Sequence, residues 1–359
     1  MLTFAKIYES MPTFYKLIIQ DIQKETADAV VVTFAVPAEL QSLFAFQAGQ
    51  YVTIKCTLDG QELRRAYSLC STPISGHWQI AIKAVKGGTF SVFANKHLKV
   101  GDLLDVSLPE GRFTLNPHPE KQRIIGAVAA GSGITPILSI VKTILAQEPN
   151  SSVVLLYGNQ TPSSTLFKNE LAQLSQQYVG RFWVHSFYSQ SVEGDSHAGR
   201  ITGEAALEIF FKKQGDLDIS AYYLCGPESM IQNVSDALKS KNVPEKKIHF
   251  ELFNTESTPD TKVLSDGHTQ VTVVLDGDES AFDMSAKQTV LEAALKHGVD
   301  APYSCQGGIC SSCLARVKEG SVEMKKNAIL TDSELADGLI LTCQAHPTSA
   351  HLVIDYDDV

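Results

Sequence analysis

Near its C-terminal end the chain reads Cys305-Gln306-Gly307-Gly308-Ile309-Cys310-Ser311-Ser312-Cys313, and a further cysteine, Cys343, follows thirty residues later. Three cysteines separated by four and then two residues, with a distant fourth, are the ligand pattern of a plant-type cluster of two irons and two sulfides. The glycines between them allow the tight turns by which a loop directs backbone N–H groups at the cluster sulfurs. The spacing therefore predicts a 2Fe-2S site held by Cys305, Cys310, Cys313 and Cys343.

Other uses of cysteine fit these four residues less well. Disulfide bonds belong mainly to exported proteins, and the first residues do not predict export. A structural zinc site usually shows two close cysteine pairs, whereas here a triplet is followed by a single residue. The remaining cysteines, Cys56, Cys70 and Cys225, stand among mostly apolar neighbours and are typical of buried packing residues.

The composition predicts several compact units. The 359 residues are about two to three times the size of a usual domain, and 44% of them are hydrophobic. No apolar run approaches the roughly 18 residues of a membrane span. We therefore expect a cytoplasmic protein without a membrane span.

The negative charge is concentrated in the C-terminal part. The net charge is -10, and residues 269–359 hold 14 acidic against 6 basic side chains. Such a surface either keeps a protein in solution or steers it toward a basic docking face. The balance argues against nucleic acid as a partner.

Residues 1–117 are rich in β-formers. Short runs at 14–19, 30–34, 50–54 and 78–82 are separated by segments of which several carry Pro, Gly or Asp. This spacing predicts a small antiparallel β-barrel.

Two motifs within this predicted barrel can carry chemistry. In Arg65-Ala66-Tyr67-Ser68, a strand would place Arg65 and Tyr67 on one face and Ser68 on the other. An arginine can pair with a phosphate and a tyrosine ring can stack on a flat heterocycle. The turn Gly87-Gly88-Thr89-Phe90-Ser91 opens a helix, whose N-terminus suits a pyrophosphate. Either motif alone is also common in plain surface strands and hairpins.

Together, and in this order, the two motifs resemble the flavin signatures of the ferredoxin-NADP reductase family. The resemblance implies that Arg65 pairs with the flavin phosphates, that Tyr67 packs on the isoalloxazine, and that Ser68 acts catalytically near flavin N5. It also implies that Gly88, Thr89 and Ser91 hold the pyrophosphate of FAD. Because a subset of related reductases uses FMN, that flavin stays an alternative.

Residues 118–253 change to an alternation of strands and helices. The apolar run 123–130 ends in Gly131-Ser132-Gly133-Ile134-Thr135-Pro136, and a helix is predicted over 137–147. With further strands at 152–157, 182–187 and 221–225, the pattern predicts a doubly wound, parallel α/β sheet. Such sheets bind ligands at the carboxyl ends of their strands, which is where this glycine-rich turn lies.

The same family resemblance extends to two segments of this region. The turn that contains Gly131, Gly133 and Thr135 resembles the nicotinamide-side signature, and Leu224-Cys225-Gly226-Pro227-Glu228 resembles the second nucleotide motif. The resemblance implies that Thr135 and a catalytic Cys225 lie beside the nicotinamide, and that Gly226 and Pro227 bind the nucleotide.

The choice of dinucleotide depends on the residues after 155–159. An acid there would bind the ribose hydroxyls of NADH, but none occurs before Glu170. This absence favours NADPH. NADH stays possible, because Gln160 stands where family members often carry arginine.

The segment Phe250-Glu251-Leu252-Phe253 ends this unit. The resemblance implies that Phe253 covers the flavin, and an edge strand with apolar ends is the alternative. Residues 254–268 are largely polar and contain Pro259 and Gly267, which predicts a linker.

Residues 269–359 resemble the plant-type ferredoxin fold, an α+β arrangement of the β-grasp type. Strands are predicted at 271–275 and 352–354 and a helix at 289–297, and Leu341-Thr342-Cys343-Gln344-Ala345 resembles the fourth-ligand segment.

The order of flavin, nucleotide and ferredoxin units resembles the reductase subunits of phenylacetyl-CoA epoxygenase systems. The resemblance implies that electrons pass from NAD(P)H through FAD and the cluster to a separate di-iron oxygenase. The chemistry agrees, because a flavin accepts the two electrons of a hydride and a cluster releases them singly. A reductase for another oxygenase, hydroxylase or desaturase, and a redox-sensing cluster protein, are the alternatives.

Overall fold

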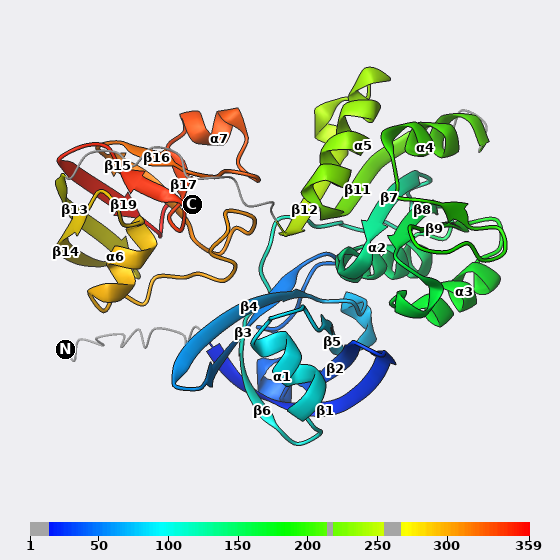
Figure 1. The fold of residues 1–359 in the computed structure, drawn as a ribbon, viewed down its shortest axis with the longest axis horizontal. Helices are drawn as coiled ribbons and strands as arrows, with labels where there is room; N and C mark the ends of the chain where they lie inside the picture. Colours follow the sequence, from blue (N-terminus) through cyan, green and yellow to red (C-terminus); the bar gives the residue numbers. More distant parts are fainter. Residues whose placement is uncertain (1–13, 214–217, 255–266) are drawn as a thin grey trace, which may run out of the picture.

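The computed structural model describes residues 14–213, 218–254 and 267–359. Figure 1 shows three units grouped around a common centre: a barrel, a parallel sheet with helices, and a C-terminal unit. Most of the predicted linker lies outside the described residues. The domain boundaries expected after residues 117, 253 and 268 stay predictions.

The first unit is an antiparallel sheet in the order β4-β3-β6-β1-β2-β5. The sheet closes on itself because Leu69, just after β4, forms an antiparallel bridge with Ile80 of β5. Helix α1 (Phe90–His97) packs Phe90 and Ala94 into the barrel core. The predicted antiparallel barrel is therefore confirmed. Its strands are β1 (Phe14–Thr26), β2 (Ala29–Ala35), β3 (Tyr51–Leu58), β4 (Gln61–Ser68), β5 (Trp78–Lys83) and β6 (Leu103–Ser107).

The second unit is a parallel sheet in the order β10-β9-β8-β7-β11-β12. One core cluster joins α2 (Ile134–Gln147) and α3 (Lys168–Gln177) to the sheet, and another joins α4 (Gly203–Leu207) and α5 (Glu228–Ser240) to it. Helices thus cover both faces, which confirms the doubly wound α/β prediction. The strands are β7 (Ile124–Ala130), β8 (Ser152–Asn159), β9 (Phe182–Tyr188), β10 (His197–Ala198), β11 (Ile219–Pro227) and β12 (Ile248–Asn254).

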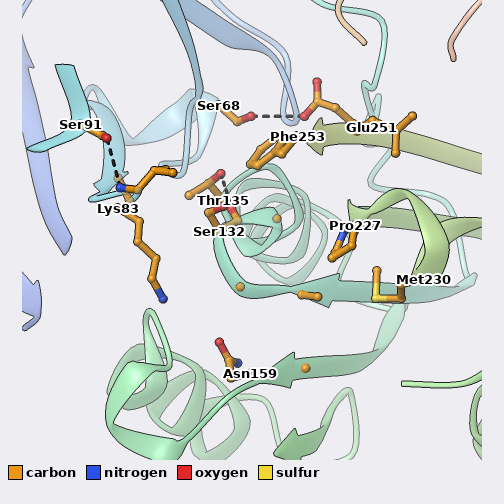
Figure 2. Close-up of a pocket in the computed structure, with 18 of the residues that line it drawn as sticks. Ser68, Lys83, Ser91, Ser132, Thr135, Asn159, Pro227, Met230, Glu251 and Phe253 are labelled. Carbon is orange, nitrogen blue, oxygen red and sulfur yellow. Dashed lines mark hydrogen bonds between the residues drawn. The ribbon is translucent and has the colours of Figure 1, made fainter. Parts of the chain in front are cut away.

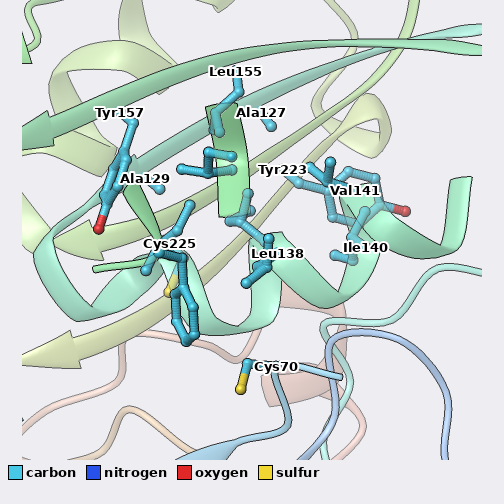
Figure 3. Packing of buried hydrophobic residues seen from close by; sticks show 14 of the residues in the cluster. Cys70, Ala127, Ala129, Leu138, Ile140, Val141, Leu155, Tyr157, Tyr223 and Cys225 are labelled. Carbon is cyan, nitrogen blue, oxygen red and sulfur yellow. The ribbon is translucent and has the colours of Figure 1, made fainter. Parts of the chain in front are cut away.

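Helix α2 lies between the parallel sheet and the barrel. Its core cluster includes barrel residues such as Val31, Ala81 and Phe113, and Figure 3 shows Cys70 and Leu138 among the buried residues of this cluster. The fully buried Ser139 hydroxyl donates to the Ser71 carbonyl over 2.6 Å. The first two units therefore share one continuous core.

The start of α2 differs from the predicted one. The helix begins at Ile134 rather than at Ile137, so Pro136 lies in its first turn. Proline is tolerated there because the first backbone N–H groups of a helix have no partner within it.

The third unit is a mixed sheet in the order β14-β13-β19-β15-β17. Strands β13 and β19 are parallel and the other pairs are antiparallel. Helix α6 (Val290–Lys296) begins with a capping box of Thr289 and Glu292 and packs its apolar side on the sheet. The predicted α+β ferredoxin-like fold is confirmed. The other elements are β13 (His268–Leu275), β14 (Asp278–Ser285), β15 (Leu314–Glu319), β16 (Val322–Met324), α7 (Asp332–Ala336), β17 (Leu339–Leu341), β18 (Ala345–Pro347) and β19 (His351–Asp355).

Within the described ranges, no helix is both long and apolar enough to cross a membrane.

A buried ion pair fixes the chain on both sides of β7. The carboxylate of Glu148, just after α2, is fully buried and accepts from Arg123 at 2.7 and 3.0 Å and from the His118 N–H at 2.9 Å. Burial opposes the charged form, but these donors, led by Arg123, prevail and lower the pKa of Glu148.

We expect Arg123→Met to lower the free energy of unfolding by about 3 kcal/mol at pH 7, because it leaves a buried carboxylate without its cation. Since the folded-state pKa is lowered, the deficit should shrink as the pH falls below about 4. Urea unfolding measures it. Lys168→Met, which breaks an ion pair whose side chains are 44% and 54% exposed, is the control and should cost less than about 1 kcal/mol. Equal losses in the two variants would contradict the prediction.

Candidate functional site

A cleft of about 1160 Å³ opens where the three units meet. Its wall combines the end of β4, the turn before α1, the turn between β7 and α2, and the ends of β11 and β12. Residues 305–313, which we call the cluster loop, complete the wall. The wall contains all the residues predicted to bind the flavin or the nucleotide except Cys225, namely Arg65, Tyr67, Ser68, Gly88, Thr89, Ser91, Gly131, Gly133, Thr135, Gly226, Pro227 and Phe253. In Figure 2, Ser68, Glu251 and Phe253 lie together at one end and Asn159 at the other.

The barrel side of the cleft offers a cation, an aromatic ring and a helix start. Arg65 is exposed, and the ring of Tyr67 lies 5.9 Å from that of Phe90 between centroids. The turn before α1 is tight, because a Cβ atom at Gly88 would lie 2.6 Å from the Ser91 hydroxyl oxygen. These groups fit a flavin nucleotide, since phosphates need the cation and N–H donors and the flat ring needs an aromatic surface.

The glycine-rich turn is held from behind by the sheet. A Cβ atom at Gly133 would lie 2.2 Å from the Cys225 carbonyl oxygen, so only glycine lets the turn approach β11 this closely. The Tyr157 hydroxyl donates to the Gly131 carbonyl over 3.0 Å, and the Thr135 hydroxyl to the Ser132 carbonyl over 3.0 Å. The start of α2 is thereby fixed at the cleft, as nucleotide binding requires.

Cys225 lies behind the cleft wall. Its side chain is fully buried within the core of Figure 3, and it is paired in register with Glu251 on the neighbouring strand. Burial, and then the charge of Glu251, raise the pKa of this thiol, which stays protonated. A position beside the nicotinamide, and the catalytic role that follows from it, stay predictions for Cys225.

Glu251 is a cleft residue that the motifs did not identify. Its carboxylate accepts a hydrogen bond of 3.2 Å from Ser68. Burial raises the pKa of Glu251 to about 8 against the opposing effect of that bond, so the carboxyl is mostly protonated at pH 7. A signal was present in the sequence, because Glu251 and Phe253 are two residues apart and share a face of β12.

The four predicted cluster ligands form two pairs of thiols. Cys305 and Cys310 lie within hydrogen-bonding reach, and so do Cys313 and Cys343. Within the described residues, no three His, Cys, Asp or Glu side chains meet at a single ion-binding point. Two pairs suit two irons, each of which takes two thiolates.

Backbone N–H groups of the cluster loop point at the sulfurs. The Gly307 N–H donates to the Cys305 sulfur over 3.3 Å. Cys310 and the N–H groups of Gly307 and Ile309 lower the pKa of Cys305 to about 7, against the effect of burial. The thiolate is therefore favoured at Cys305, whereas the hydrogen bond to Cys305 and burial raise the pKa of its neighbour Cys310.

The fourth-ligand segment is tied to the same loop. The backbone N–H and hydroxyl of Thr342 both donate to the Cys313 carbonyl, at 3.1 and 3.0 Å. Gly308 has φ +69°, and a Cβ atom there would lie 2.9 Å from the Lys326 carbonyl oxygen. The loop geometry thus fits a 2Fe-2S cluster.

The two thiol pairs face different surroundings. Cys305 and Cys310 belong to the cleft wall, together with Ile309. Cys313 and Cys343 are only 1% and 5% exposed within the C-terminal unit. The cluster site therefore opens toward the residues predicted to hold the flavin.

The fold and the cleft define an NAD(P)H oxidoreductase with a flavin unit, a nucleotide unit and an iron-sulfur unit in one chain. Three family models agree: an oxidoreductase FAD-binding domain matches residues 16–115, an oxidoreductase NAD-binding domain matches 127–236, and a 2Fe-2S iron-sulfur cluster binding domain matches 273–348. The chain belongs to the family of ferredoxin reductases that serve as reductase components of oxygenase systems. FAD, a nicotinamide nucleotide and a 2Fe-2S cluster are its cofactors, as predicted.

Three relatives match over nearly their whole length. A subunit of 1,2-phenylacetyl-CoA epoxidase from Escherichia coli (strain K12) is 40% identical over 97% of this chain and 99% of its own. The ferredoxin reductase component of 3-ketosteroid-9-alpha-monooxygenase from Rhodococcus rhodochrous is 33% identical, over 95% and 96%. The solved structure of phthalate dioxygenase reductase superposes with a TM-score of 0.60 at 26% identity, covering 95% of this chain and 98% of that one.

The raised pKa of Glu251 predicts a pH-dependent stability. Between its unfolded-state value of about 4.3 and about 8, the folded protein holds a proton that the unfolded chain releases. The free energy of unfolding should therefore fall as the pH rises from about 5 and level off above about 8. Because the side chain meets cleft water, we expect a contribution of about 2 kcal/mol.

Glu251→Gln replaces the carboxyl by a group of the same shape that does not titrate. Urea unfolding at pH 6 and pH 9 should show the decline in the wild-type protein and its loss in the variant. A decline of the same size in the variant would assign it to other groups.

Proposed function

We propose that this chain passes electrons from NADPH through FAD to a 2Fe-2S cluster and on to the oxygenase component of a phenylacetyl-CoA epoxidase system. One observation carries the proposal: Cys305 and Cys310 stand in the same cleft wall as the predicted flavin and nicotinamide residues. A redox-sensing protein needs no such shared cleft. An electron-transfer enzyme does, because its redox groups must lie close together.

The chain's own residues bind and orient the cofactors in this proposal. Bound FAD takes up the two electrons of a hydride, and the cluster passes electrons one at a time. Arg65 and the turn before α1 bind the flavin phosphates, and Tyr67 and Phe253 bind its ring. Ser68 is the catalytic residue at the hydride-accepting end, where its hydroxyl is held by the carboxyl of Glu251.

The preference for NADPH rests on the charge at one end of the cleft. Asn159 and Gln160 lie there at the end of β8, and no acid stands among the described residues that line this end. Arg200 is exposed in the same wall. A guanidinium can bind the additional phosphate that distinguishes NADPH.

The proposed oxygenase partner is inferred from the relatives and from the acidic charge of residues 269–359. The Escherichia coli epoxidase protein is 40% identical to this chain, which supports the same kind of oxygenase here. The di-iron centre of that partner rests on the resemblance of the sequence alone. The excess of acids in residues 269–359 favours a basic docking face on that partner. A cytoplasmic location belongs to the same proposal.

The assay for this function is NADPH-dependent reduction of cytochrome c, followed by reduction of an isolated phenylacetyl-CoA epoxidase oxygenase component. Cys310→Ser should keep flavin reduction by NADPH and lose most one-electron reduction, because it removes a cluster ligand. Cys56→Ser, at a partly buried barrel cysteine, is the matched control and should behave as wild type. No turnover with either nucleotide, or full-rate reduction of the oxygenase by Cys310→Ser, would refute the proposal.

The nucleotide preference has its own test. Arg200→Ala should raise the KM for NADPH about ten-fold and leave that for NADH within about two-fold, because a charge-assisted hydrogen bond to the phosphate is lost. Gln160→Arg, which adds a cation at the same end, should shift the preference further toward NADPH. Equal changes in both KM values for Arg200→Ala would count against a phosphate contact.

A further inference from the structure

A short chain of hydroxyl and carboxyl groups connects the barrel to the cluster loop. The Tyr51 hydroxyl lies 2.9 Å from the Ser312 hydroxyl, and the Ser312 hydroxyl donates to Glu110 Oε1 over 3.2 Å. The Thr53 hydroxyl donates to the same carboxylate oxygen over 3.1 Å. Ser312 lies between two cluster ligands, whereas the other three residues belong to the barrel.

The direction of these hydrogen bonds is fixed by the number of protons available. Glu110 Oε1 receives hydrogen bonds from Thr53 and Ser312 and is therefore an acceptor. A hydroxyl has a single proton, so Ser312 uses it on Glu110 and accepts from Tyr51. The Cys310 sulfur is 3.6 Å from the same Ser312 oxygen. These contacts attach the segment between Cys310 and Cys313 to the barrel.

The barrel residues Tyr51 and Glu110 of this hydrogen-bonded series are rigidly held. Tyr51 and Glu110 exchange two backbone hydrogen bonds of 2.9 Å, and Tyr51 is only 3% exposed. A Cβ atom at Gly111 would lie 2.9 Å from the Tyr51 ring, so the ring packs directly on the backbone there. Tyr51 is also paired in register with Ser68, the predicted flavin residue. The hydroxyl of Tyr51 is therefore a fixed point between the flavin site and the cluster loop.

Ion pairs between the C-terminal unit and the rest of the chain lie closer to solvent. Arg64 pairs with Asp300 at 2.7 Å, Arg112 with Glu334, and Lys326 with Glu228 at 3.4 Å, and each pair has a partner at least 40% exposed. Pairs with an exposed partner are screened by salt, and the buried Arg64 guanidinium also packs on the Tyr303 ring at 4.3 Å. None of these six residues belongs to the cluster loop, whereas Ser312 does.

We propose that Tyr51 and Glu110 are positioning residues which, through Ser312, hold the segment between the second and third cluster ligands in one orientation against the flavin barrel. This role is independent of the electron acceptor. Only the activity measurement below rests on the proposed function.

The first test is hydrogen exchange in the cluster-loaded protein. Tyr51→Phe removes one hydroxyl and little else. It should speed exchange about five-fold in residues 305–313 and in residues 108–113, because one buried hydrogen bond is lost. Ser312→Ala removes the middle hydroxyl of this series of hydrogen bonds and should give the same pattern of exchange. The test therefore stays available if one of the two variants folds poorly.

Tyr356→Phe is the matched control. The Tyr356 hydroxyl also makes a buried hydrogen bond of 2.9 Å to a hydroxyl, that of Thr342, but both residues belong to the C-terminal unit. This variant should leave exchange in residues 108–113 at the wild-type rate. Wild-type exchange at 305–313 in both Tyr51→Phe and Ser312→Ala, or an equal effect of Tyr356→Phe at 108–113, would overturn the proposal.

The second test separates positioning from loss of stability. With NADPH, Tyr51→Phe should reduce ferricyanide, which takes electrons at the flavin, at the wild-type rate, and cytochrome c about five-fold more slowly. A general loss of stability would lower both rates together, and that result would overturn a positioning role. Absence of both activities in the wild-type protein would refute the proposed function, while the exchange experiment would still decide this inference.

Discussion

The approach of Gly133 to the carbonyl of Cys225, which any side chain would forbid, sets the relation between the first two units. The absence of a Cβ atom lets the turn after β7 rest on β11, and the direction of α2 follows from it. Because α2 packs on the sheet with one side and on the barrel with the other, its direction also sets how the barrel stands against the sheet. The opening between them, into which the cluster loop faces, is a consequence of that packing.

Much of this arrangement could be predicted from the sequence because the informative signals are local. The cysteine spacing, the Arg65 to Ser68 motif and the two glycine-rich turns each lie within about ten residues, and runs of β-forming and apolar residues indicated the strands around them. The start of α2 was predicted three residues late because Pro136 was placed before the helix, whereas it occupies the first turn. The placement of Cys225 in the core also follows from local sequence, since its neighbours are apolar, but the motif alone suggested a residue of the cleft wall.

The remaining features depend on contacts between units that the sequence does not bring together. Ser68 and Glu251 are 183 residues apart, and Tyr51 and Ser312 are 261 apart. No periodicity relates such pairs, and a glutamate in a strand is usually exposed. Their burial, the raised pKa of Glu251 and the order of the hydroxyl groups at Ser312 appear only when the three units are placed side by side.

The contact between the barrel and the parallel sheet differs in physical character from the contact between these two units and the C-terminal unit. The barrel and the parallel sheet share an apolar core, whereas the C-terminal unit combines hydroxyl contacts at the cluster loop and ion pairs such as Arg64 with Asp300 with smaller apolar contacts, those of Ile309 and Ala328 with a core cluster of the parallel sheet. Added salt leaves the contact between the first two units almost unchanged and weakens the ion pairs of the C-terminal unit, because counter-ions screen partly exposed pairs over about 10 Å at 0.1 M. The ionic strength of the buffer therefore affects how tightly the C-terminal unit is held. Turnover numbers measured at different ionic strengths describe molecules that differ in this respect.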